Sequence, residues 1–120
     1  MKPPEQKVWG TTIELFANGA ASTHYIEVKA GGFCSEHRHE HKENVFYVIE
    51  GELRVTWWDI DGHEHGLTLF AGDDTAISVG IWHSFEAMVD TKCIEIYDYR
   101  YYGVDIERRV SGGLRTDKSD

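Results

Sequence analysis

Apolar and polar residues alternate with a period of two in several short stretches of the chain. The alternation is clearest over residues 24–28 and 53–57. It also occurs over residues 93–102, where Ile94 and Ile96 share one face and Tyr97 lies on the other. Because successive side chains of a strand point to opposite faces, this period predicts β-strands over all three stretches.

Turn-forming residues separate these stretches at short intervals. Asn18-Gly19 predicts a hairpin turn between strands at residues 11–16 and 22–28. Further turns are expected at Gly31-Gly32, Gly51, Asp61-Gly62 and Gly72-Asp73-Asp74. No amphipathic stretch of about ten residues or more indicates a helix before Gly103. Short strands at regular spacing predict an all-β protein, either a sandwich or a barrel.

Charge and hydropathy exclude several classes of partner. The 120 residues include 12 Lys and Arg against 21 Asp and Glu, a formal charge of -9, which argues against binding to nucleic acid or anionic lipid. No apolar run approaches the roughly 20 residues of a membrane helix, and the first residues lack the apolar core of a signal peptide. The sequence therefore predicts no nucleic-acid partner, no membrane partner and a cytoplasmic location.

The composition changes near residue 104. From Gly103 onward acidic and basic residues balance, and residues 111–120 contain almost nothing apolar to bury. We therefore predict one domain over residues 1–104 and a polar, flexible C-terminal tail over residues 105–120. Cys34 and Cys93 are too few for a disulfide scaffold and are expected to be free thiols.

Three of the seven histidines, His37, His39 and His41, stand at alternate positions. Residues two apart point away from each other on a helix, but on a strand they share a face about 6.6 Å apart. The spacing thus allows two imidazoles to reach one metal ion only if it lies on a strand. His83 follows the apolar Ile81-Trp82, so burial is expected, and a buried imidazole needs a partner. We expect His83 to be the third ligand.

The order and spacing of these residues resemble the two motifs of the cupin superfamily. The resemblance runs from residue 31 to residue 87 and rests on Gly31, His37, His39, position 44 and Gly51, followed by Gly72, Ser78-Val-Gly80 and His83. It implies a small double-stranded β-helix, the cupin or jelly-roll barrel of the type-2 cupins. It also implies a metal held by histidines in the mouth of the barrel, and a homodimer.

The chain departs from the cupin pattern at the position where the family most often has a metal-binding Glu. Asn44 stands there, and Glu43 lies one residue earlier. A slip of one residue places Glu43 on the opposite face of the strand unless a bulge re-aims it. The expected metal ligands are therefore His37, His39 and His83, with Asn44 or Glu43 as a further candidate. The ion is a divalent transition metal, with Fe, Mn, Ni and Zn all compatible.

Neutral ligands leave a divalent ion with its full charge and with open coordination positions. Such a site favours a small polar or anionic metabolite, and the cupin resemblance is compatible with a dioxygenase or a sugar-isomerase-like enzyme. Glu43, His41 and Tyr97 are the candidate proton-transfer groups. Two alternatives remain open: a non-catalytic module that binds a sugar or metabolite, and a metal-free, epimerase-like protein in which a histidine is the base.

Two further groups of residues have a structural and a functional interpretation. His63 and His65 follow a predicted turn, which favours exposed hairpin positions over a second metal site. Six aromatic residues are expected mostly to fill the core or a dimer interface, with pocket lining as the alternative: Phe46, Trp57, Trp58, Trp82, Phe85 and Tyr97.

Overall fold

The computed structural model describes residues 2–99 and 106–116. Within these residues the protein is all-β, and it contains no helix, so none that could span a membrane. The strands are β1 (Glu5–Lys7), β2 (Gly10–Ala17), β3 (Ala21–Val28), β4 (Gly32–Phe33), β5 (Glu36–Arg38), β6 (Lys42–Glu50), β7 (Glu52–Trp58), β8 (Glu64–Phe70), β9 (Asp74–Ile77), β10 (Trp82–Ala87), β11 (Thr91–Tyr99), β12 (Glu107–Val110) and β13 (Gly113–Leu114).

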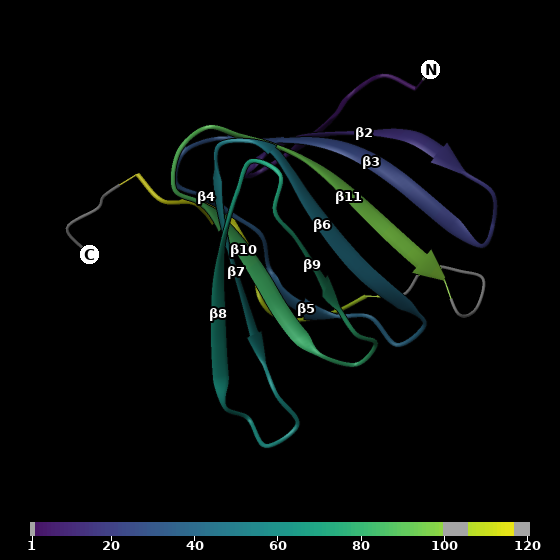
Figure 1. Ribbon diagram of the computed structural model, residues 1–120, viewed down its shortest axis with the longest axis vertical. Coiled ribbons are helices and arrows are strands. Elements are labelled where there is room, and N and C mark those ends of the chain that lie inside the picture. The colour runs from purple at the N-terminus through teal and green to yellow at the C-terminus, as the bar shows by residue number, and fades with distance from the viewer. Residues whose placement is uncertain (1, 100–105, 117–120) are drawn as a thin grey trace.

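The strands form two sheets. The first has the order β1-β2-β3-β11-β6-β9, and all of its pairs are antiparallel. In the second, β10 pairs with β4 and β5 along one edge and with β7 along the other, and β8 extends the sheet beyond β7. Figure 1 shows the first sheet to the right and the β7, β8 and β10 strands to the left, as two faces of one jelly-roll barrel.

Alternate residues of both sheets point into a shared core. On β6 the buried positions are Asn44, Phe46 and Val48, and on β10 they are His83 and Phe85. The Phe46 and Phe85 rings meet edge to face, with their centroids 5.7 Å apart. Burial of such rings is the main source of stability in a fold of this size. Polar residues at one end of this inward face, Asn44 and His83, occupy positions that a purely structural core would fill with apolar residues.

The strands predicted from alternation are confirmed. Residues 24–28 lie in β3 and residues 53–57 in β7; the strand predicted over 93–102 is β11 as far as Tyr99, and residues 100–102 lie outside the described residues. The Asn18-Gly19 turn joins β2 to β3, where the Asn18 side chain accepts hydrogen bonds from the backbone N–H groups of residues 20 and 21. Cys34 and Cys93 are free, as expected, and both are buried.

Two short strands lie in the stretch for which the sequence predicts a flexible tail. β12 pairs with β5, and β13 pairs with β4. Side chains hold β12 as well, since Arg109 forms an ion pair with Glu36 at 2.9 Å and lies 4.5 Å from the centre of the Trp58 ring. Backbone pairing needs no apolar residues, so the composition gives no signal for it. Residues 105 and 117–120 lie outside the described residues, and the domain boundary at residue 104 stays a prediction.

Candidate metal centre

The short strand β5 and the strand β10 bring two of the three expected ligands together. His37 and His83 are directly opposite each other in the antiparallel register of these strands. His39 lies one residue beyond the end of β5, so the His-x-His spacing spans a strand and the residue after it. Residues directly opposite on neighbouring strands have Cβ atoms about 5 Å apart, so this register alone places two imidazoles within reach of one ion.

The three imidazoles form a compact, buried group. The ring centroids of His37 and His83 are 4.4 Å apart, those of His37 and His39 4.9 Å, and those of His39 and His83 5.5 Å. One ring nitrogen of each residue lies within 4.8 Å of the others. Nitrogens that share a tetrahedral ion at about 2.0 to 2.1 Å are about 3.3 Å apart, so small ring rotations bring all three onto one ion.

Backbone carbonyls fix the proton positions on two of the rings. His37 Nδ1 donates to the carbonyl oxygen of Ser35 at 2.7 Å, and His83 Nδ1 donates to that of Ile81 at 2.8 Å. A carbonyl oxygen only accepts, so in the neutral rings the proton is on Nδ1 and Nε2 carries a lone pair. This hydrogen bond from the non-ligating nitrogen is the usual support of a metal-bound histidine.

Burial keeps these rings neutral. It lowers the pKa of His37 from 6.5 to about 3, and the neighbouring imidazoles of His83 and His39 lower it further. Burial likewise lowers the pKa of His83 to about 4. At neutral pH both Nε2 lone pairs are therefore available to a cation rather than to a proton. The donor set thus fits a divalent transition metal, for which neutral imidazole is a preferred ligand.

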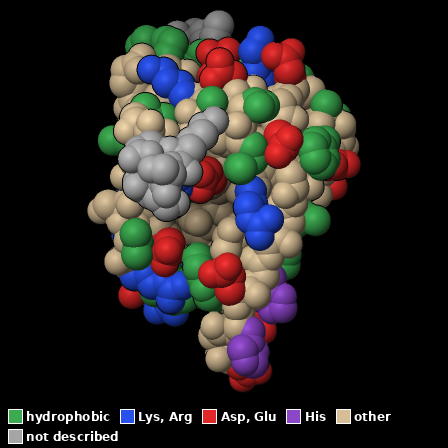
Figure 2. All heavy atoms as spheres, turned by 90° about the vertical axis from the view of Figure 1, so that its left-hand side faces the viewer, with side chains coloured by type: hydrophobic (Ala, Val, Ile, Leu, Met, Phe, Trp, Pro, Cys, Tyr) green, Lys and Arg blue, Asp and Glu red, His purple; other side chains and the backbone are tan. Residues whose placement is uncertain are grey.

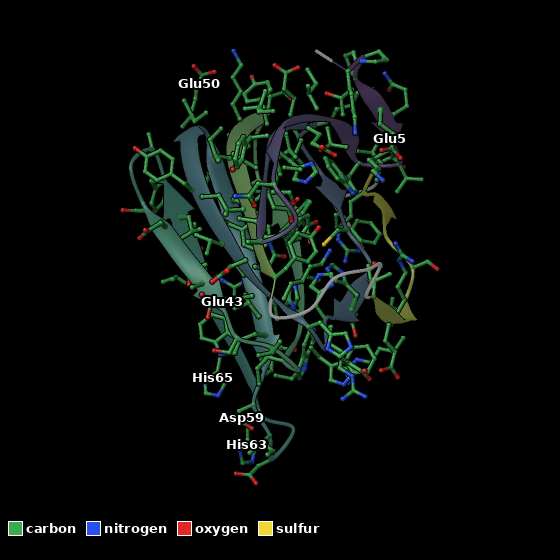
Figure 3. The ribbon with its side chains drawn as sticks, turned by 90° about the vertical axis from the view of Figure 1, so that its right-hand side faces the viewer. Glu5, Glu43, Glu50, Asp59, His63 and His65 are labelled. Atoms are coloured by element: carbon green, nitrogen blue, oxygen red, sulfur yellow. The ribbon has the colours of Figure 1, made fainter. Side chains whose placement is uncertain are left out.

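Of the two candidate fourth ligands, Asn44 lies at the histidine group and Glu43 does not. The Asn44 side chain is fully buried, with its Oδ1 3.2 Å from His83 Nε2. Glu43 is the preceding residue of β6 and is only half buried, so strand alternation directs it to the opposite face (Figure 3). The register of β6 against β11 is regular around this position, and no bulge re-aims Glu43.

Of the candidate proton-transfer groups, Tyr97 lies at the metal centre, whereas Glu43 and His41 do not. Tyr97 lies beside the metal centre, with its ring centroid 5.7 Å from that of His39. Burial raises the pKa of its phenol well above the ordinary value, and the nearby Glu95 carboxyl raises it further. His41 lies in the bend between β5 and β6 and does not belong to the group of three histidines. Its Nε2 is 4.0 Å from a Glu40 carboxylate oxygen.

A pocket of about 980 Å³ reaches the metal centre from one side of the barrel. His37 and Tyr97 line it, whereas Phe46 does not and belongs to the core. The charged side chains that line the pocket are of both signs: Lys7, Lys42, Arg108, Glu5, Glu14 and Glu95. The charges that line the pocket therefore balance, unlike those of the whole chain.

Sequence reasoning missed Glu95 and Arg108. Glu95 is 7% exposed on the inward face of β11, and the Arg108 guanidinium reaches back from β12 to donate to Ser35 Oγ at 3.0 Å. Glu95 alternates with Cys93 and Tyr97 in the sequence, so its place on the same face of the strand could have been predicted. Arg108 had no such signal, because it lies in the stretch predicted to be a tail.

A second group of possible ligands lies at the tip of the β7–β8 hairpin. The ligand atoms of Asp59, Asp61 and His63 lie within 4.8 Å of one another, and His65 Nε2 is 2.8 Å from Asp59 Oδ2. Figure 3 shows Asp59, His63 and His65 at the far end of the molecule, and Figure 2 shows histidine side chains exposed there. Turn hydrogen bonds to Asp59 account for this arrangement, so the interpretation as exposed hairpin residues is favoured.

Comparison with protein families and solved structures agrees with this geometry. Residues 24–97 match the family described as "Cupin domain". None of the curated proteins matches the chain.

Among solved structures, the chain is similar to oxalate decarboxylase from Bacillus subtilis. The structure of that enzyme at pH 4.6 has a TM-score of 0.77 at 19% identity and covers 88% of this chain. A structure addressing proton-coupled electron transfer in oxalate decarboxylase has a TM-score of 0.74 at 20% identity and covers 89% of this chain. The matched part is 29% of the first of those chains and 30% of the second, so the likeness concerns the barrel.

Proposed function

Because the chain belongs to the cupin family, we propose that it binds one divalent transition metal ion through His37, His39 and His83 and presents it to a small polar or anionic metabolite. The observation that carries this proposal is the convergence of three buried imidazoles, two of them with Nε2 lone pairs set by backbone carbonyls. An ion bound there supplies Lewis-acid chemistry at its open coordination positions.

The pocket supports a small ligand with negative charge. Lys7, Lys42 and Arg108 offer it positive charge beside three lining glutamates, and His37 connects the pocket to the metal centre. The Tyr97 phenol keeps its proton at neutral pH and shares it with the Glu95 carboxyl, so it does not act as a base. Of the proton-transfer groups expected from the sequence, Tyr97 is the one whose ring lies beside His39.

Metal binding is tested by titrating the chelator-treated protein with Co²⁺, Mn²⁺, Fe²⁺, Ni²⁺ and Zn²⁺, each followed by calorimetry. One ion per chain is expected to bind to the wild type. The double variant His37→Ala, His39→Ala is expected to lose this binding, whereas His63→Ala is expected to retain it. Binding that persists in the double variant would refute the proposed ligand set, and the absence of binding to the wild type would favour the metal-free alternative.

Ligand binding and turnover need a separate measurement. We expect oxalate and other small carboxylates to perturb the visible spectrum of the Co²⁺-loaded protein, because they occupy its open coordination positions. Oxygen uptake by the Fe²⁺-loaded protein with carboxylates, thiols and diketones distinguishes a dioxygenase from a binding module. Uptake with one compound class alone supports the enzyme, and spectral perturbation without turnover of any compound supports the non-catalytic module. The native metal, the homodimer and the cytoplasmic location stay predictions.

A further inference from the structure

The carboxyl group of Glu95, on β11, contacts Asn44 at the candidate metal centre. Its side chain is 7% exposed, and a charged group this far from water is unfavourable unless other groups hydrogen-bond to it. Asn44 Nδ2 donates to Glu95 Oε2 at 3.2 Å, and the Tyr97 hydroxyl also bonds to the Glu95 carboxyl. Glu95 is therefore linked to the metal centre through Asn44 and Tyr97.

These contacts determine which way the Asn44 amide faces. The Nδ2 group has two partners, the Glu95 carboxylate at 3.2 Å and the carbonyl oxygen of Ile96 at 3.5 Å. Both are acceptors, so the NH₂ end of the amide must face them. The Oδ1 end consequently points the other way, to within 3.2 Å of His83 Nε2.

Two lone pairs therefore face each other across this contact. His83 Nδ1 donates to the Ile81 carbonyl, which leaves Nε2 of the neutral ring as an acceptor. Asn44 Oδ1 is also an acceptor. Two buried acceptors at 3.2 Å repel each other unless a cation lies beside both of them. A separation of about 3 Å is the one expected for two ligands that share an ion at about 2.0 to 2.2 Å.

We propose that Asn44 Oδ1 is the fourth protein ligand of the metal and that Glu95 is the positioning residue that holds the amide in the ligating orientation. This inference rests on the proposed function, since it concerns the ion held by the three histidines. It makes the protein ligands of the metal electrically neutral and places the Glu95 carboxyl group one hydrogen bond away from the ligand Asn44. It also excludes Glu43, whose side chain is on the opposite face of β6.

The first experiment compares Co²⁺ affinity and the visible absorption spectrum in three variants. Asn44→Leu removes the oxygen ligand, and Glu95→Gln replaces an acceptor with an amide whose NH₂ group can turn the Asn44 amide around. Both are expected to lower Co²⁺ affinity about 10- to 100-fold and to alter the spectrum. Glu43→Gln removes a carboxylate from the residue next to Asn44 and is expected to change neither the Co²⁺ affinity nor the spectrum. Unchanged affinity in Asn44→Leu, or a loss in Glu43→Gln, would overturn the assignment.

A second comparison tests the role of Glu95 without depending on Asn44→Leu being folded. Asn44→Asp keeps the shape of the side chain and an oxygen ligand, and it is expected to retain Co²⁺ binding. The two oxygens of a carboxylate are equivalent, so this variant has no orientation to lose. Glu95→Gln is therefore expected to cause no loss of Co²⁺ affinity in the Asn44→Asp protein and can raise it, because the Gln amide donates to the new carboxylate that the Glu95 carboxylate repels. An equal loss in both backgrounds would show that Glu95 acts by charge and not by positioning.

The two levels of the argument fail in different ways. If the wild type binds no Co²⁺, or if the His37→Ala, His39→Ala protein still binds it, the proposed function itself is wrong. If the histidine variants lose Co²⁺ while Asn44→Leu and Glu95→Gln retain full affinity and an unchanged spectrum, the proposed function stands and the role of Asn44 and Glu95 is refuted.

Discussion

Acidification of the metal-free protein from pH 7 to pH 5 is expected to lower its free energy of unfolding through His37 and His83. The pKa of the folded protein is about 3 for His37 and about 4 for His83, below the ordinary value of 6.5 that applies to the unfolded chain. As the pH falls through 6.5, the unfolded chain therefore takes up protons that the folded protein does not. The contribution to stability is complete above pH 6.5 and is lost as the pH falls toward the folded values.

The size of the loss follows from these pKa differences. Each pH unit below 6.5 costs about 1.4 kcal/mol per ring, so at pH 5 each histidine has lost about 2 kcal/mol. The two rings together account for a loss of about 4 kcal/mol, a large part of the ~5–15 kcal/mol that stabilises an ordinary domain. His24 adds to the loss, because its half-buried position also lowers its pKa.

Urea unfolding followed by tryptophan fluorescence, at pH 5, 6 and 7 with a chelator present, measures this dependence. His37→Asn is expected to reduce the loss between pH 7 and pH 5 by about 2 kcal/mol, whatever it does to stability at pH 7. His63→Asn is the matched control, since its side chain is 77% exposed and lies at the far end of the molecule (Figure 3). If His37→Asn shows the full wild-type loss, the His37 ring is not held neutral by burial and the reasoning fails.

Three further predictions concern the barrel around the site. Phe46→Ala, which truncates a fully buried ring, is expected to lower the free energy of unfolding by about 3–5 kcal/mol in urea titrations; less than 1 kcal/mol would contradict its central place in the core. Gly51→Ala is expected to cost about 1–3 kcal/mol or more in the same assay, because Gly51 has φ +106° and a Cβ there would lie 2.5 Å from Thr91 Oγ1. Cys34 and Cys93 are expected to resist a thiol reagent at pH 8 until the protein unfolds, since burial raises the pKa of both thiols; rapid labelling of the native protein would be the contrary result.

Local patterns predicted most of the barrel because each strand has its own alternation. Residues 24–28 and 53–57 alternate clearly, and both lie in strands. Which strands become neighbours is decided by the packing of the whole chain, and alternation carries no information about it. The pairing of His37 with His83 across β5 and β10 joins residues 46 positions apart. His83 was expected as a ligand from its apolar neighbours and from the resemblance to cupin motifs, but the pairing of these two strands was not.

The missed residues have a common physical cause. On β11 the apolar Ile94 and Ile96 suggest one face of the strand as the core face, yet both are only half buried. The fully inward positions are Cys93 and Glu95, where a thiol and an acid weaken the hydrophobic signal. At a functional site polar residues are buried for their chemistry, so hydrophobicity alone does not predict that a residue such as Glu95 points inward. Arg108 was missed for a different reason, because edge pairing of β12 depends on backbone groups that every sequence has.

The acid sensitivity and the metal binding proposed for this barrel arise from one physical property. Burial that disfavours imidazolium at His37 and His83 also keeps their Nε2 lone pairs free of protons at neutral pH. A divalent ion can bind to these lone pairs, and the nitrogens that bind it are already buried in the barrel. Bound metal should therefore stabilise the protein at pH 5 as much as at pH 7, and less only as the pH falls toward the folded pKa values of about 3 and about 4, where protons compete for the same nitrogens. A site whose histidines were solvated would not show the instability of the metal-free form below pH 6.5, and its stabilisation by metal would already decrease as the pH passes below 6.5.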